Sequence, residues 1–216
     1  MQILHIDCSP RPDGQSRLVS AGIVAGLSTL WPGATVVMRD ISTLSPPDAD
    51  YATLLTSPPK SSESTARGST ALSDILIREI ETADILVVGT PVHNFTVPAA
   101  LKSWLDHVVR VNRTFTVRPN GKVGLVKDRP VFIGVAAGGM IFADGAQQPD
   151  FFTPYLKAVL NCIGLCDLHF VPVQGTAVRC EAEQDAELKQ VLSELKFGFF
   201  AKHQAQQANL QVGDNA

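Results

Sequence analysis

The stretch DILVVGTPVHNF, Asp84–Phe95, joins a continuous apolar run to a turn of unusual composition. An apolar run without polar alternation is typical of a β-strand that is covered on both faces, as in a parallel sheet. Pro91 keeps the chain from entering a helix directly after the strand, whereas Pro98 suits the first turn of a helix because its missing N–H is not needed there. The stretch therefore predicts a buried strand, a short overhanging loop and then a helix.

Similar apolar runs, each bounded by turn residues, predict further strands at Gln2–Asp7, Ala34–Asp40, Pro130–Ala137 and Leu168–Val173. Helical patterns separate these runs, and strands that alternate with helices are typical of an α/β fold with a parallel sheet and right-handed crossovers. Units of this kind in a chain of this length predict a flavodoxin-like three-layer fold. Its five-stranded parallel sheet would have the order 2-1-3-4-5, with helices on both faces.

Apolar residues recur at helical spacing in the segments between the strands. The expected helices carry Leu18, Ile23 and Leu27 with Ser16 as N-cap; Leu72, Ile75, Leu76 and Ile80; Leu101, Trp104, Leu105 and Val108; Thr153–Ile163 with Gly164 as its stop; and Ala182–Phe200.

Two segments are too long for ordinary connections between a strand and a helix. Ser42–Thr70 is rich in serine, threonine and proline, and such loops are usually either functional lids or disordered. The lid would cover the pocket of a neighbouring subunit. Arg110–Lys127 contains the turn sequence PNGKVG and predicts a small β-hairpin inserted before the fourth strand.

Length and composition limit the class of protein. The chain has 216 residues, of which 45% are hydrophobic and 18% are charged, so we expect a single domain over residues 1–200 and a polar, frayed tail over residues 201–216. A net charge of −3 does not favour nucleic-acid binding, which requires a clustered basic face. The start lacks the pattern of a signal peptide and no apolar run reaches the length of a membrane span, so we expect a cytoplasmic protein without a membrane segment.

The cysteines do not favour a metal site. Cys162, Cys166 and His169 can be read as a metal cluster, but the two cysteines lie one helical turn apart in an apolar stretch. Free cysteine in such a position behaves as a small hydrophobic residue. We therefore expect no metal.

In a sheet of this order, ligands bind beyond the carboxyl ends of the strands, where the strand order reverses between strands one and three. The first loop, Cys8–Arg17, offers the side chains of Ser9, Gln15 and Ser16 at the start of a helix, and helix N-termini attract phosphate. It lacks both the nucleotide P-loop pattern and the dinucleotide G-x-G-x-x-G pattern, so a monophosphate is favoured. The alternative is an ordinary loop in which Ser16 caps the helix.

The loop after the third strand is suited to a flat heterocycle. Asn94 carries an amide donor and an acceptor, Val92 and Phe95 offer apolar surface, and His93 can donate a proton near neutral pH. In the alternative reading, Asn94 bonds its own backbone and Phe95 packs inward. The loop after the fourth strand, AAGGMIFADG, places paired glycines directly after the strand, which allows either a sharp turn or the close approach of a ring.

Taken together, these residues resemble the FMN-dependent NADH:quinone oxidoreductase and azoreductase family. The resemblance covers nearly all of residues 1–200 in order, and its most specific part is the box PVHNF against the family pattern P-M-Y-N-F. The other matching pieces are Ser9 with Gln15 and Ser16, ALSDILI (Ala71–Ile77), LKSWLD (Leu101–Asp106), the R-x-x-x-T-F of Arg110–Phe115, NGKVGLVKDRP, the glycines of AAGG, and TPYL (Thr153–Leu156).

The resemblance implies a homodimer that takes hydride from NADH or NADPH onto FMN and passes it to a quinone or azo compound by a ping-pong mechanism. It also implies two sets of cofactor-binding residues. The FMN phosphate would be held by Ser9, Gln15, Ser16 and Arg17, with Arg17 acting mainly through its backbone. The flavin ring would be lined by Pro91, Val92, Asn94 and Phe95, with Gly138 and Gly139 under its far edge.

Two departures from the family pattern fall near the expected acceptor pocket. His93 stands where the family usually has tyrosine, and Ala136–Ala137 stand where it usually has Ser-Arg. Our hypothesis is that His93 faces the acceptor and donates a proton to the reduced product. Because fold alone does not set function, the alternatives are a flavodoxin-like electron carrier, a flavin-binding regulator, and an NAD(P)H:flavin reductase.

Overall fold

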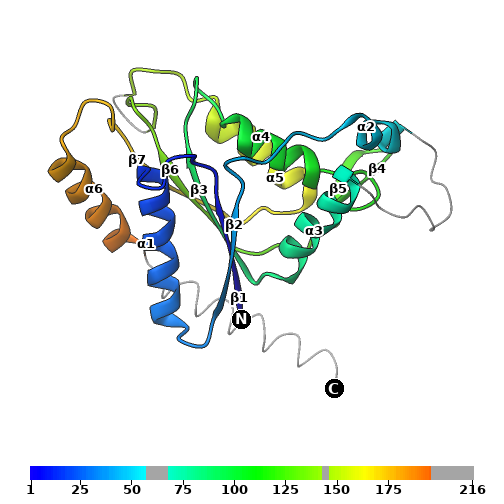
Figure 1. Cartoon of the computed structure of the whole chain (residues 1–216), viewed down its shortest axis with the longest axis horizontal. Coiled ribbons are helices and arrows are strands. Elements are labelled where there is room, and N and C mark those ends of the chain that lie inside the picture. Colours follow the sequence, from blue (N-terminus) through cyan, green and yellow to red (C-terminus); the bar gives the residue numbers. More distant parts are fainter. Residues whose placement is uncertain (57–67, 143–145, 196–216) are drawn as a thin grey trace.

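The computed structural model describes residues 1–56, 68–142 and 146–195. Its centre is a sheet of parallel strands in the order β2-β1-β3-β6-β7, which confirms the predicted order 2-1-3-4-5 when these strands alone are counted (Figure 1). The strands are β1 (Gln2–Asp7), β2 (Thr35–Asp40), β3 (Ile85–Pro91), β6 (Val131–Ala136) and β7 (Leu168–Val173).

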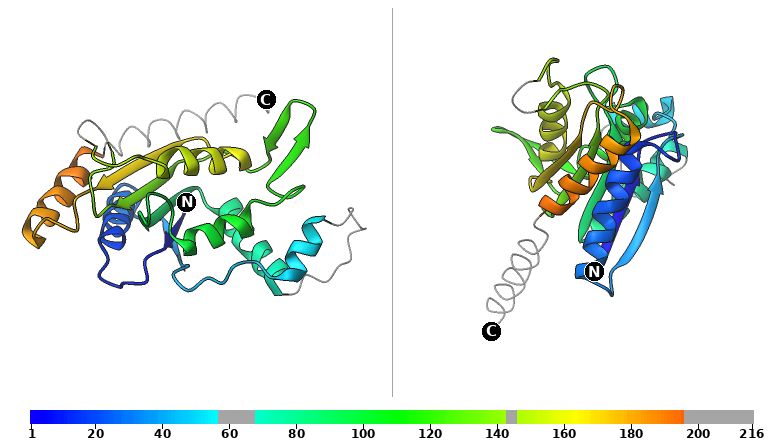
Figure 2. Two further views of the ribbon diagram at one scale, coloured as in Figure 1. Left: turned by 90° about the horizontal axis from the view of Figure 1, so that it is seen from above. Right: turned by 90° about the vertical axis from the view of Figure 1, so that its left-hand side faces the viewer.

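Helices cover both faces of the sheet and give the predicted three layers. One face carries α1 (Gln15–Leu30) and α6 (Glu181–Glu194), and the other carries α3 (Gly68–Thr82), α4 (Ala99–Val108) and α5 (Phe152–Ile163) (Figures 1 and 2). Strand β3 contributes to both cores, since Ile85 and Val87 pack in the core beside α1 and Leu86 and Val88 pack in the other. Burial on both faces is the reason for its continuous apolar run.

The helix boundaries differ from the expectation at several positions. Helix α1 begins at Gln15 with Gly14 as N-cap, so the prediction of Ser16 as the cap is wrong. Leu18 and Ile75, expected on the buried faces of their helices, are 41% and 43% exposed. Residues 196–200 of the last predicted helix lie outside the described residues, as does the tail 201–216. The single domain over residues 1–200 stays a prediction.

The predicted stop of α5 at Gly164 is confirmed, whereas the interpretation of Cys166 as a small hydrophobic residue one helical turn beyond Cys162 is wrong. Helix α5 ends at Ile163 because Gly164 adopts a left-handed conformation, with φ of 107°. Cys166 therefore lies beyond the helix and is exposed. Within the described ranges, no group of three or more His, Cys, Asp or Glu side chains is placed to hold a metal ion. In the same ranges, no helix combines the length and the apolar character needed to cross a membrane.

The polar segment Ser42–Thr70 is partly helical. It contains α2 (Ala49–Thr56), and α3 begins at Gly68, whereas residues 57–67 lie outside the description. Tyr51 of α2 is 1% exposed, and its hydroxyl donates to the backbone carbonyl of His107 at 3.1 Å. The His107 ring in turn contacts the Ser45 carbonyl through Nε2 at 3.1 Å. This part of the segment is thus tied to α4, and the role of Ser42–Thr70 as a lid stays a prediction.

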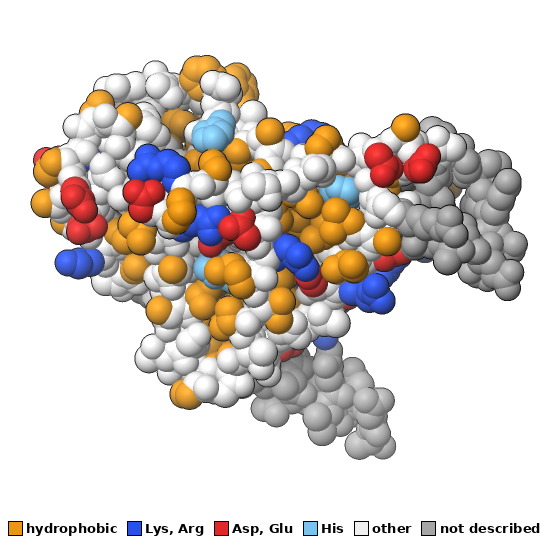
Figure 3. Space-filling view, viewed as in Figure 1, with side chains coloured by type: hydrophobic (Ala, Val, Ile, Leu, Met, Phe, Trp, Pro, Cys, Tyr) orange, Lys and Arg blue, Asp and Glu red, His pale blue; other side chains and the backbone are white. Residues whose placement is uncertain are grey.

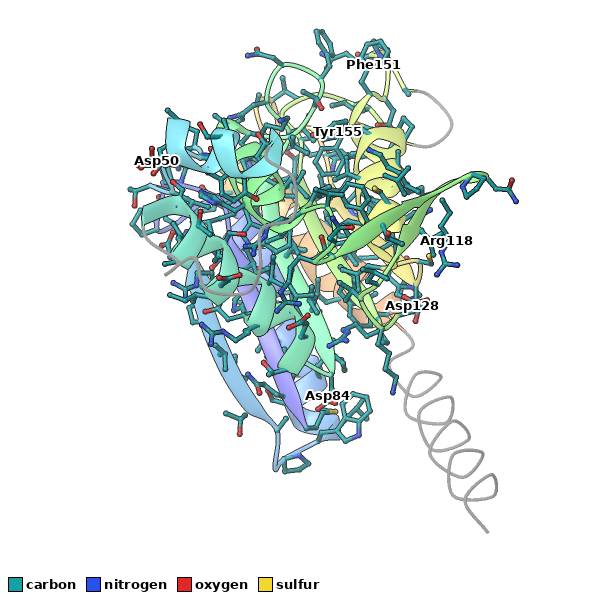
Figure 4. All side chains as sticks on the ribbon, turned by 90° about the vertical axis from the view of Figure 1, so that its right-hand side faces the viewer. Asp50, Asp84, Arg118, Asp128, Phe151 and Tyr155 are labelled. Atoms are coloured by element: carbon teal, nitrogen blue, oxygen red, sulfur yellow. The ribbon has the colours of Figure 1, made fainter. Side chains whose placement is uncertain are left out.

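The predicted hairpin within Arg110–Lys127 is confirmed. It consists of antiparallel strands β4 (Phe115–Arg118) and β5 (Gly121–Gly124), and it projects from the body of the molecule with Arg118 near its tip (Figure 4). On the face shown in Figure 3, Lys and Arg side chains are interspersed with Asp and Glu rather than gathered in one patch.

Replacing Arg129 by methionine should lower the free energy of unfolding by about 2 kcal/mol, because carbonyls at the end of α3, two of them in partly buried contacts, would lose a charged donor. The Nη1 group of Arg129 donates to the carbonyls of Ile80 (2.6 Å), Glu81 (3.1 Å) and Ala83, at the end of α3. Thermal unfolding followed by circular dichroism should show a melting temperature about 6 °C lower.

The matched control is Arg78→Met, which removes an exposed guanidinium that donates within its own helix, to the Asp74 carbonyl at 3.2 Å. This variant should melt within about 2 °C of the wild type. Equal melting temperatures for the two variants would contradict a capping role for Arg129.

Candidate functional site

The loops after β1, β3 and β6 meet at one edge of the sheet, as the strand order requires. The Cys8 N–H donates to the Gly89 carbonyl at 2.9 Å, and the Val92 N–H donates to the Ala136 carbonyl at 2.8 Å, so each loop starts beside the next. Figure 4 shows Asp84, which precedes β3, at one end of the molecule, and Phe151 at the opposite end, near the carboxyl ends of the strands. The predicted loops are therefore brought together.

The first loop presents buried polar groups at the N-terminus of α1. Ser9 and Ser16 are 5% and 1% exposed, and no side chain caps the helix. The Oε1 atom of Gln15 is buried without a hydrogen-bond partner. Rotation of the amide by 180° places a donor at the same position. The Arg17 N–H donates to the Gly14 carbonyl at 2.9 Å, so the N–H groups of Gln15 and Ser16 are the first-turn donors left for a ligand. Together with the Gln15 amide, they suit a bound anion.

The side chain of Arg17 is occupied by the loop backbone and by two carboxylates. Its Nε and Nη2 donate to the Ser9 carbonyl at 3.0 and 2.7 Å, and Nη2 also donates to Asp40 at 2.6 Å. Its Nη1 donates to Asp7 at 3.3 Å. Partial burial opposes ionisation of Asp40, but hydrogen bonds from Ser42 and Arg17 keep the pKa of this carboxyl below its usual value. The carboxylate is therefore charged and able to hold Arg17 at neutral pH.

The loop after β3 is a tight two-residue turn. The backbones of His93 and Thr96 exchange hydrogen bonds at 2.9 and 3.0 Å, and between them Asn94 and Phe95 have φ of 47° and 70°. Positive φ at both central positions is the geometry of a type I′ turn, which asparagine tolerates and a bulky phenylalanine does not. Phe95 is 44% exposed, so the alternative in which it packs inward is wrong. The strained turn presents both side chains at the sheet edge.

The loop after β6 is held against the loop after β7. The carbonyls of Gly138 and Gly139 accept hydrogen bonds from the N–H groups of Ala177 and Gly175, both at 3.3 Å. A Cβ atom on Gly138 would meet only Ala177, at 3.4 Å, so a flat group can approach this exposed glycine. Gln174, which is 9% exposed, accepts hydrogen bonds from the N–H groups of Ile141 and Phe142 at 2.8 and 2.7 Å. It fixes the continuation of the loop.

Sequence reasoning missed three residues that support the site: Asp7, Asp40 and Gln174. Asp7 was visible as a charged residue at the end of an apolar strand, and Asp40 stands at the corresponding end of the next run. Their common partner is Arg17, which the fold alone brings to them. Gln174 carried no signal, because its function depends on contacts between two loops far apart in the sequence.

Cys8 lies in the first loop but is not an activated nucleophile. The thiol is 1% exposed, and burial, the dominant influence, raises its pKa far above the usual value. It therefore stays protonated at neutral pH and packs in the core. The chemistry of this edge depends on a bound group rather than on covalent catalysis by this cysteine.

Comparisons with known proteins agree with this geometry. A family model described as a flavodoxin-like fold matches residues 1–196. A Pseudomonas fluorescens protein named FMN-dependent NADH:quinone oxidoreductase 4 is 44% identical over 183 residues, which cover 83% of this chain and 87% of that one. The Burkholderia lata protein named FMN-dependent NADH:quinone oxidoreductase 5 is 42% identical over 181 residues, covering 81% and 85%.

Among solved structures, a Bacillus anthracis FMN-dependent NADH-azoreductase in complex with FMN superimposes with a TM-score of 0.72 at 24% identity. The match covers 89% of this chain and 96% of that chain, and it shows that the two share a fold. By the family model and the sequence identities, the chain belongs to the flavodoxin-like family of FMN-dependent NADH:quinone oxidoreductases.

Proposed function

We propose that this protein is an FMN-dependent oxidoreductase that takes hydride from NADH and passes it to quinones or azo compounds by a ping-pong mechanism. The relatives named above support this proposal. The observation that carries it is the pairing of two features on one sheet edge. At one end lies the N-terminus of α1, which has no side-chain cap, with the buried Gln15 Oε1 that lacks a hydrogen-bond partner. At the other end lies the exposed Asn94–Phe95 turn.

The residues present fit FMN. Ser9, Gln15 and Ser16 would hold the phosphate, and the Asn94–Phe95 turn would bind the flat ring together with Pro91 and Val92. Gly138 and Gly139 would lie under the far edge of the ring. Bound FMN supplies the chemistry of accepting and returning a hydride.

The chain contributes orientation, electrostatics and exclusion of water. In this proposal, backbone N–H groups near Asn94, Phe95 and Gly139 stabilise negative charge at the pyrimidine end of the ring. Phe95 covers the ring with apolar surface. These groups are fixed before any ligand arrives, because the turn and the glycine loop are tied to the sheet by backbone hydrogen bonds.

The exposed His93 is proposed to donate a proton to the acceptor. A quinone that receives a hydride needs one further proton to become the hydroquinone, and a histidine can supply it near neutral pH. His93→Gln should therefore lower kcat with a quinone by about tenfold and weaken the dependence of kcat on pH. An unchanged profile would show that His93 has another role.

The quaternary structure and location belong to the same proposal. We propose a cytoplasmic homodimer, and the exposed apolar side chains of Val117 and Leu125, at 64% and 51%, support self-association around the hairpin. Light scattering of the purified protein tests the dimer, which a mass near 23.1 kDa would contradict.

Flavin titration tests the proposed function. FMN at 100 times its dissociation constant should add about 2.7 kcal/mol to the stability, or roughly 5–10 °C to the melting temperature. Anaerobic NADH should then bleach the flavin absorbance by two electrons. Accumulation of a one-electron radical would favour the electron-carrier alternative, and absence of flavin binding would exclude every flavin-dependent reading.

A further inference from the structure

The Arg17 guanidinium joins three elements beneath the first loop. It bonds Asp7 at the end of β1, Asp40 at the end of β2, and the carbonyl of Ser9 in the loop itself, while its own backbone belongs to α1. We call Asp7, Arg17 and Asp40 the clamp. Arg17 is 18% exposed and Asp7 is 3% exposed at the side chain, so this pair is largely shielded from water, whereas Asp40 is half exposed.

The clamp fixes the direction in which the loop leaves the sheet. Two N–H groups of one guanidinium hold the Ser9 carbonyl, and because a peptide unit is planar, they also fix the Ser9–Pro10 peptide. Asp7 is held in turn by the Ser20 hydroxyl at 2.8 Å, within α1. Arg17 therefore positions Ser9 directly, and through Asp7 and Ser20 it ties the loop to the start of α1. Ser9 and the start of α1 are the two sources of donors for a phosphate.

Charge balance indicates that Arg17 acts through geometry rather than through attraction. Its positive charge is matched by two carboxylates, so the clamp as a whole carries no excess positive charge toward an anion in the loop. A guanidinium that bound the phosphate directly would have its fork free on the ligand side. Here the fork is occupied by Ser9, Asp7 and Asp40.

We propose that Arg17 is a positioning residue, and that the clamp preorganises the first loop so that the chain prefers the phosphorylated flavin over riboflavin. This inference rests on the proposed FMN-dependent function. It assigns the phosphate preference to a side chain that does not touch the phosphate, and it makes Asp40 a contributor to anion binding in spite of its negative charge.

The main experiment measures the dissociation constants of FMN and riboflavin for apoprotein variants by quenching of flavin fluorescence. Arg17→Met should weaken FMN binding by about tenfold or more, whereas riboflavin binding should change less than about twofold, because riboflavin has no phosphate to position. The matched control is Arg39→Met. It breaks the ion pair between Arg39 of β2 and Glu79 of α3 without touching Ser9. This variant should keep the wild-type ratio of the FMN and riboflavin dissociation constants.

For Asp40→Asn, the direction of the change in FMN affinity is the test. Asp40 is 50% exposed, so this variant should fold even if Arg17→Met does not. If Asp40 acted only by its charge, removing it would tighten the binding of an anion. If it acts through the clamp, Asp40→Asn should weaken FMN binding, by about threefold, and should have no weakening effect in the Arg17→Met background.

The outcomes separate this inference from the proposed function. A wild-type chain that binds neither flavin overturns both. A wild-type chain that prefers FMN, combined with an Arg17→Met variant that keeps the preference, overturns the clamp alone. Tighter FMN binding by the Asp40→Asn single variant also overturns it.

Discussion

Gly89→Ala is expected to lower the free energy of unfolding by about 3 kcal/mol, the upper range for overpacking a buried site. It should also weaken FMN binding by about tenfold. A Cβ atom at this position of β3 would lie 2.4 Å from the Ser20 hydroxyl oxygen, 2.5 Å from Oδ1 of Asp7 and 2.8 Å from the Ser16 carbonyl oxygen. Ser16 and Ser20 belong to the first turns of α1, and Asp7 belongs to the clamp that holds the first loop. The clash therefore displaces α1 and the first loop, which present the donors to the phosphate. Urea denaturation and FMN titration of the same preparation measure the two effects.

Gly33→Ala is the matched control, because a Cβ atom on Gly33 would meet nothing within 4 Å. Its stability and FMN affinity should equal those of the wild type. A Gly89→Ala variant that unfolds within about 0.5 kcal/mol of the wild type would show that α1 does not pack against β3 as closely as the structure has it.

The central strands β1, β3 and β6 could be predicted because each is buried on both faces. Ile85 and Val87 pack toward α1 while Leu86 and Val88 pack toward α3, α4 and α5, and the result in sequence is an unbroken apolar run. The predicted loops could be grouped before the structure was known because parallel strands end at the same edge.

Helix α2 could not be predicted from its own residues. The segment around it is rich in serine and proline, and the stabilising event is the burial of Tyr51 against His107, far along the chain. The N-cap of α1 was missed for a related reason. Serine is the better cap by local preference, but Gly14 packs with its Cα facing the Ser9 side chain, where an added Cβ would lie 2.6 Å from Oγ. Tertiary contact decides both cases.

The geometry of the turn after β3 also lay outside sequence reasoning. A type I′ turn is usually signalled by Asn-Gly, and here Asn94 is followed by phenylalanine. The local preference of Phe95 argues against the left-handed conformation that it adopts, with φ of 70°. Residues held in such conformations cluster at functional sites, where the surrounding structure enforces them. The conflict between sequence and backbone therefore marks the same residue that the PVHNF pattern singled out.

Phe95→Gly is expected to stabilise the protein and to weaken FMN binding, two effects of opposite sign. Removing the strained phenylalanine relieves about 1–3 kcal/mol, and the greater freedom of glycine in the unfolded chain offsets about 0.5–1 kcal/mol of this gain. The net expectation is a stability gain of about 1 kcal/mol. The ring of FMN, however, would lose the apolar surface of the exposed phenylalanine. Burial of a side chain of this size contributes about 1.5–3 kcal/mol, so the FMN dissociation constant should rise by at least tenfold, to roughly 100-fold.

Asn112→Gly separates relief of strain from loss of the ring contact. Asn112 also has a positive φ, of 60°, but it lies at the base of the β4–β5 hairpin, where its N–H donates to the Phe115 carbonyl. Its replacement should give a smaller stability gain, because asparagine tolerates this conformation better than phenylalanine, and should leave FMN binding unchanged. If Phe95→Gly lowers stability, Phe95 must contribute more to packing than the strain of the turn costs. If it raises stability without weakening FMN binding, the flavin ring does not rest on this turn, and the phenylalanine is retained for contact with an acceptor or a partner instead.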